Sequence, residues 1–115
     1  MPIPEMETLI NELRSKNYKV GLLSNVIPNT AKDIREHGGY RSFDFTVLSY
    51  ELGIAKPELD IYEFAMKQLT DTKPSEVVFI DDQERCLIPA REMGIRTILA
   101  MNTKQIITDV RDIIS

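Results

Sequence analysis

Four short apolar runs alternate with segments of helical periodicity along the chain, and this alternation limits the possible folds more than any other feature. The runs cover residues 19–24, 45–48, 76–80 and 96–100. Apolar residues at helical spacing predict helices over residues 4–16, 28–37, 58–69, 83–93 and 103–114. Strands that alternate with helices pair in parallel, because each crossover helix returns the chain to the same end of the sheet. The sequence therefore predicts an α/β domain, with a parallel sheet between two layers of helices.

The third apolar run, Val78-Phe79-Ile80, is followed by two adjacent carboxylates, Asp81 and Asp82. In an open parallel sheet, ligands bind at the edge formed by the carboxyl ends of the strands. Adjacent carboxylates repel each other unless a cation or a basic side chain neutralises them. Mg²⁺ suits such a pair, since it binds one or two carboxylates together with water and phosphate oxygens. Considered alone, the pair is more typical of a helix N-cap beside a solvated aspartate.

Two further segments place polar residues at the ends of predicted elements. The first apolar run ends in Ser24-Asn25, and Ala55-Lys56-Pro57-Glu58 places a lysine just before a predicted helix. Each has an ordinary structural explanation, because a strand-end serine caps turns and most lysines are solvated. Their order along the chain is more informative: Ser-Asn, then Lys-Pro-Glu, then Asp-Asp.

This order resembles the second, third and fourth motifs of the haloacid dehalogenase-like (HAD) hydrolase superfamily. Within it, residues 48–61 are similar to small sugar-phosphate phosphatases, and residues 74–100 are similar to the N-terminal phosphatase domain of soluble epoxide hydrolases. The resemblance implies a Rossmann-like α/β/α sheet and a Mg²⁺-dependent phosphatase. The resemblance further implies that such a phosphatase acts on a small phosphorylated metabolite through an aspartyl-phosphate intermediate.

The resemblance also implies a role for each candidate residue. Ser24 and the Asn25 region donate hydrogen bonds to phosphoryl oxygens, and Lys56 neutralises the phosphoryl group and the nucleophile. Asp81 binds Mg²⁺ directly, while Asp82 binds it through water or orients the lysine.

One motif of the superfamily is absent from the sequence. The nucleophilic aspartate belongs to a segment Asp-x-Asp-x-Thr or Val after a strand, and none of the 115 residues form such a segment. We therefore expect residues 1–115 to correspond to the C-terminal part of the hydrolase core, lacking the first-motif strand and the cap. We also expect little or no phosphatase activity from the chain alone.

The position of the missing strand leaves alternatives open. In the family's sheet it lies between the strands that end at Ser24 and Asp81. There are three alternatives: either the two exposed strand edges pair with each other, or a second chain completes the sheet, or the chain derives from a longer protein. The alternative function is a non-catalytic fragment or binding module that retains the fold.

Composition indicates the cellular setting. The net charge is −4 and no basic stripe is present, which argues against nucleic acid as a partner. The N-terminal residues do not form a signal peptide, and no apolar run reaches the length of a membrane span. The single cysteine, Cys86, cannot form an internal disulfide, as is typical of a reducing compartment. We expect a cytoplasmic protein without a membrane partner.

Overall fold

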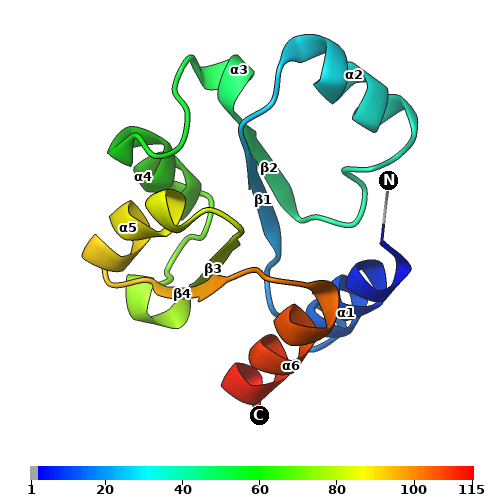
Figure 1. Ribbon diagram of the computed structural model, residues 1–115, viewed down its shortest axis with the longest axis vertical. Coiled ribbons are helices and arrows are strands. Elements are labelled where there is room, and N and C mark those ends of the chain that lie inside the picture. Colours follow the sequence, from blue (N-terminus) through cyan, green and yellow to red (C-terminus); the bar gives the residue numbers. More distant parts are fainter. Residues whose placement is uncertain (1–2) are drawn as a thin grey trace. The chain divides into compact units, whose positions relative to one another are not determined.

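The computed structural model describes residues 3–115, whose helices and strands are labelled in Figure 1. These residues belong to two compact units, divided between Leu69 and Thr70. The first unit contains α1 (Pro4–Ser15), β1 (Gly21–Ser24), α2 (Pro28–Glu36), β2 (Phe45–Leu48), α3 (Ser49–Leu52) and α4 (Leu59–Lys67). The second contains η1 (Pro74–Glu76), β3 (Val78–Asp81), α5 (Glu84–Glu92), β4 (Arg96–Leu99) and α6 (Thr103–Ile114). Among residues 3–115, no helix combines the length and the apolar character that crossing a membrane requires.

Each unit contains one pair of parallel strands. In the first unit β1 pairs with β2, with Ser24 opposite Leu48. In the second unit β3 pairs with β4, with Asp81 opposite Leu99. The parallel pairing and the alternation of strands with helices confirm the predicted α/β class, although the four strands described form two separate two-stranded sheets and not the single parallel sheet expected. Since parallel strands point the same way, Ser24 and Asp81 each occupy the carboxyl end of their sheet.

The core of the first unit comes from its helices and from β2. Both α3 and α4 pack against β2. Val47 and Leu48 on β2 are 1% exposed, and Ile61 and Tyr62 on α4 are buried as their helical spacing predicts. Burying one large aliphatic side chain contributes about 1.5–3 kcal/mol. The carboxyl end of β2 is therefore firmly anchored.

Hydrogen bonds fix the start of the first strand pair. The Asp44 carboxylate accepts from the Val20 backbone N–H at 2.7 Å and from Arg14 Nε at 3.0 Å. The Asp44 N–H donates in turn to the Val20 carbonyl oxygen at 2.7 Å. These bonds extend the pairing of β1 with β2 by one residue and tie it to α1. Because register is set at this end, the position of Ser24 at the other end is set too.

The core of the second unit is built around α5, which packs against both β3 and β4. Leu87 and Ala90 on α5 are fully buried, and Ile98 on β4 is 6% exposed. Gly94 ends the helix region with a φ of +90°, a conformation that favours glycine. This packing fixes the direction of β3 and hence the position of Asp81 at its end.

The structure corrects several predicted boundaries; the first strand, for example, begins at Gly21 and not at Lys19. Residues 49–52, expected to be loop, form helix α3, which is too short to produce a periodic pattern. The third strand begins at Val78 and not at Glu76, because Pro74–Glu76 form a turn of 3₁₀-helix. The Glu76 carboxylate stabilises that turn by accepting from the Lys73 N–H at 2.8 Å. At its other end the strand includes Asp81, which was expected to follow it.

Candidate functional site

Ser24 and Asn25 lie where β1 ends and the chain turns toward α2. Ser24 is the last residue of the strand and is half-buried, while Asn25 is exposed. Val26, the residue after Asn25, is held by the segment that follows β2, because its N–H donates to Ser49 Oγ at 2.9 Å. Ser49 is the first residue of α3 and directly follows β2. The loops after β1 and β2 are therefore braced against each other.

Lys56 is held beside the end of β1 by the side chain of Asn25. Lys56 N–H donates to Asn25 Oδ1 at 2.9 Å, and Asn25 Nδ2 donates to the Lys56 carbonyl oxygen at 3.0 Å. The two residues are 31 positions apart in the sequence. The structure thus places Lys56 next to the Ser24-Asn25 segment, at the carboxyl end of β1.

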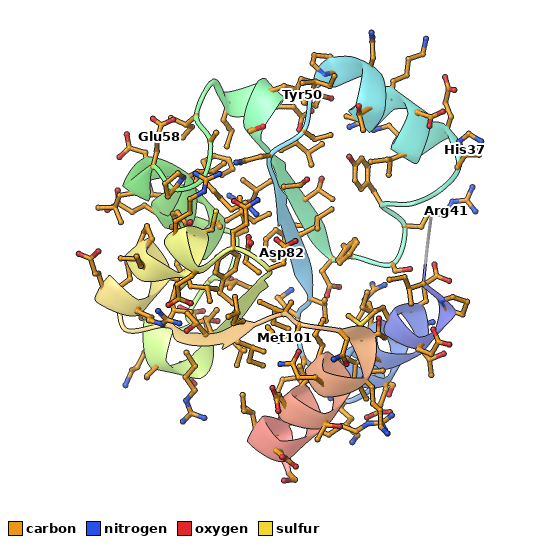
Figure 2. All side chains as sticks on the ribbon, viewed as in Figure 1. His37, Arg41, Tyr50, Glu58, Asp82 and Met101 are labelled. Atoms are coloured by element: carbon orange, nitrogen blue, oxygen red, sulfur yellow. The ribbon has the colours of Figure 1, made fainter. Side chains whose placement is uncertain are left out.

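The turn that carries Lys56 is closed by Glu58, which precedes α4 (Figure 2). Its carboxylate accepts from the Ala55 N–H at 3.2 Å, and its own N–H donates to the Ala55 carbonyl oxygen at 2.8 Å. Lys56 is half-buried within this turn and is joined to Pro57 by a cis peptide bond. The turn is therefore defined both internally and by Asn25.

Asp81 is the last residue of β3 in the second unit, and Asp82, labelled in Figure 2, follows it directly. Asp81 is only 9% exposed, whereas Asp82 is exposed. Asp81 Oδ1 accepts from the Gln83 N–H at 2.9 Å, which fixes the carboxylate as the chain turns into α5. The pair therefore combines one fixed carboxylate with one that is open to solvent.

The carboxylates of Asp81 and Asp82 could supply part of the coordination shell that Mg²⁺ requires. Within residues 3–115, no cluster of three or more histidine, cysteine, aspartate or glutamate side chains has metal-holding geometry. A complete protein cage, as used for zinc, is therefore not found in that range. Mg²⁺ instead keeps several waters and uses one or two carboxylates together with phosphate oxygens. Two adjacent aspartates at a strand end meet that requirement.

The five predicted site residues fall into two groups. The structure brings Ser24, Asn25 and Lys56 to one strand end in the first unit, and Asp81 and Asp82 to one strand end in the second. The meeting of both groups in one site stays a prediction. Sequence reasoning did not assign roles to Ser49 and Glu58, which position the two loops. The sequence feature that could have identified Glu58 as a positioning residue is its place directly after Lys56-Pro57.

A model of one protein family matches most of the chain. It describes haloacid dehalogenase-like hydrolases and covers residues 1–94.

Two curated relatives are similar in sequence. Bifunctional epoxide hydrolase 2 of Mus musculus is 44% identical over 71 residues, which are 62% of this chain and 13% of that protein. Sesquiterpene phosphatase astK of Aspergillus oryzae is 32% identical over 94 residues, which are 81% of this chain and 47% of that protein. The chain thus spans less than half the length of both relatives.

A solved structure shares the fold. A HAD family enzyme from Bacteroides thetaiotaomicron, crystallised in complex with magnesium and inorganic phosphate, aligns with a TM-score of 0.72 and 34% identity. The alignment covers 88% of this chain and 53% of that one. The likeness confirms a Rossmann-like α/β fold for the aligned part of the chain.

Proposed function

The chain belongs to the haloacid dehalogenase-like hydrolases, and from this premise we propose that it carries the phosphate- and magnesium-binding residues of a phosphatase. Its substrate is a small phosphate ester. A curated relative is named as a phosphatase, and a structural neighbour was crystallised with magnesium and inorganic phosphate. Both support this class of chemistry.

One observation within the chain carries the proposal. Asn25, directly after Ser24, is bonded through its side chain to the backbone of Lys56. A hydroxyl donor and an ammonium group therefore belong to neighbouring loops at one strand end, although they are far apart in sequence. This combination suits a dianionic phosphoryl group, because phosphoryl transfer depends mainly on positioning and on charge stabilisation.

The proposed roles in the first unit follow from side-chain chemistry. The Ser24 hydroxyl donates a hydrogen bond to a phosphoryl oxygen, and the Asn25 segment adds a donor from the same turn. Lys56 supplies a compact positive charge, which offsets the charge on the phosphoryl oxygens and on the attacking carboxylate. Lysine suits this role because its ammonium presents three donors and acts on phosphate as a point charge.

The proposed role of the second unit is to hold the metal ion. Asp81 is fixed by Gln83 and offers a carboxylate of defined orientation, while the exposed Asp82 binds through water or orients the lysine. When bound, Mg²⁺ offsets the charge of the phosphoryl oxygens. Replacing Asp81 by asparagine removes a charged oxygen ligand and should weaken Mg²⁺ binding.

The covalent step is not assigned to any of these residues. In the complete reaction of the family, an aspartate attacks phosphorus and the resulting aspartyl-phosphate is hydrolysed by water. No Asp-x-Asp segment occurs in the 115 residues, so we expect little or no turnover of a phosphate ester by the chain alone. A second chain that completes the sheet is the partner we propose, together with a small phosphorylated metabolite.

Binding experiments on the intact chain test the proposal. Calorimetry should detect Mg²⁺ binding that falls at least about tenfold in Asp81→Asn. The matched control Asp112→Asn makes the same change on the exposed face of α6 and should bind Mg²⁺ as the unaltered chain does. Equal Mg²⁺ affinity of Asp81→Asn and the unaltered chain would remove the metal role.

The phosphate arm of the test uses a charge-matched pair of variants. NMR titration with inorganic phosphate in the presence of Mg²⁺ should show weaker binding for Lys56→Gln. Lys67→Gln, which removes the same charge from the exposed end of α4, should bind as the unaltered chain does. Equal losses in both variants would mean that only net charge matters, and the assignment of Lys56 would be wrong. Mg²⁺-dependent turnover that disappears in Asp81→Asn would contradict the expected inactivity.

A further inference from the structure

We propose that Asn25 is a positioning residue. Its side-chain amide holds the backbone of Lys56 so that Ser24 and Lys56 can bind the same phosphoryl group. The inference rests on the proposed function, since it assumes that Lys56 binds phosphate. The sequence left open whether the backbone or the side chain of Asn25 donates to the phosphoryl group, and the inference assigns the side chain to Lys56 instead.

The geometry of the contact supports a positioning role. Asn25 uses both ends of its amide on a single residue: Oδ1 accepts from the Lys56 N–H at 2.9 Å, and Nδ2 donates to the Lys56 carbonyl oxygen at 3.0 Å. Both distances lie at the most common value for an N–H···O bond. The side chain therefore pairs with the Lys56 backbone in the way that a neighbouring strand would.

Few other side chains could make this contact. The pairing needs one acceptor and one donor on a short planar group. Aspartate offers two acceptors and would place a carboxylate oxygen against the Lys56 carbonyl. Glutamine carries the same group on a longer stem. Asparagine at position 25 is therefore matched to its partner in both chemistry and reach.

Holding the backbone affects the ammonium group at the end of the side chain. A lysine side chain has four rotatable bonds, and its reach is defined only if its Cα is fixed. The two bonds from Asn25 fix the peptide groups on both sides of that Cα, and Glu58 closes the same turn. The cost of ordering Lys56 on a ligand is thereby reduced before the ligand arrives.

The first measurement follows the contact itself. Amide hydrogen exchange of the Lys56 N–H, recorded by NMR on the intact chain, should become about tenfold faster in Asn25→Ala, because the acceptor of that N–H is lost. The control Asn29→Ala makes the same change in α2 and should leave the exchange rate unchanged. Unchanged exchange in Asn25→Ala would overturn the proposal.

The second measurement separates positioning from direct contact with phosphate. Asn25→Ala should weaken binding of inorganic phosphate by about three- to tenfold. In a Lys56→Gln background the same change should have no further effect, because Asn25 acts through Lys56. A loss that persists in the Lys56→Gln background would show that Asn25 contacts phosphate directly, and the proposal would fail.

The two measurements distinguish failure of this inference from failure of the proposed function. If the unaltered chain binds no inorganic phosphate, the phosphate site itself is wrong. The positioning role for phosphate then falls with it, and the exchange rates still decide whether Asn25 holds Lys56.

Discussion

Gly21 on β1 lies under the ring of Phe45, its partner on β2, and replacing it with alanine should destabilise the first unit. A Cβ at position 21 would lie 2.1, 2.4 and 2.6 Å from three carbons of that ring. Such distances are far inside van der Waals contact, so the ring must move. The glycine therefore allows an aromatic side chain to cover the strand backbone.

Two effects of opposite sign determine the size of the change. Alanine restricts the unfolded chain and would stabilise the protein by about 0.4–1 kcal/mol if it fitted without strain. Overpacking costs about 1–3 kcal/mol, because the ring must leave its preferred rotamer or the strands must separate. The steric cost is larger, and we expect Gly21→Ala to lower the free energy of unfolding by about 1–2 kcal/mol.

Urea unfolding followed by circular dichroism measures this change as a lower midpoint. Amide exchange at Leu22 and Val47 reports on the first unit separately. Phe45→Leu should cost less stability in the Gly21→Ala background than in the unaltered chain, because the shorter side chain relieves the clash. Stability of Gly21→Ala equal to or above that of the unaltered chain, or additive effects in the double variant, would refute the reasoning.

Other perturbations test contacts elsewhere in the chain. Tyr40→Phe should raise stability by about 1 kcal/mol in urea unfolding, because the Tyr40 hydroxyl is buried without a partner among residues 3–115. Asp44→Ala should lower the free energy of unfolding by about 1 kcal/mol, since Arg14 and the Val20 N–H lose an acceptor. The hydrogen bond from Arg91 lowers the pKa of Glu84, so this pair stabilises the fold above the ordinary glutamate pKa. That contribution disappears as the pH falls through the lowered pKa, and stability measured against pH should decline less on the acid side in Arg91→Gln.

Much of the fold could be predicted from the sequence because its signals are local. The apolar runs ending at Ser24 and Leu48 became strands that end at those residues, the run ending at Ile80 became a strand that extends one residue further, and residues 103–114 form the predicted helix. Within the helices predicted over residues 4–16 and 58–69, the buried positions include the apolar residues Leu9, Ile10, Ile61 and Tyr62. The predicted boundaries were wrong at Ser49–Leu52 and Pro74–Glu76, since one helical turn contains too few residues to show a period.

For the candidate site, the apolar runs and the residue types were enough to predict which polar residues lie near strand ends and which chemical groups they offer. The order of the motifs, through its resemblance to the haloacid dehalogenase-like hydrolases, pointed to Ser24, Asn25, Lys56, Asp81 and Asp82. The hydrogen bonds between the Asn25 side chain and the backbone of Lys56, 31 residues further along the chain, could be found only in the folded protein. A hydrogen bond between a side-chain amide and a peptide group far away in the sequence produces no periodic or compositional pattern. The two groups meet only when pairing of β1 with β2 brings the loops after these strands together.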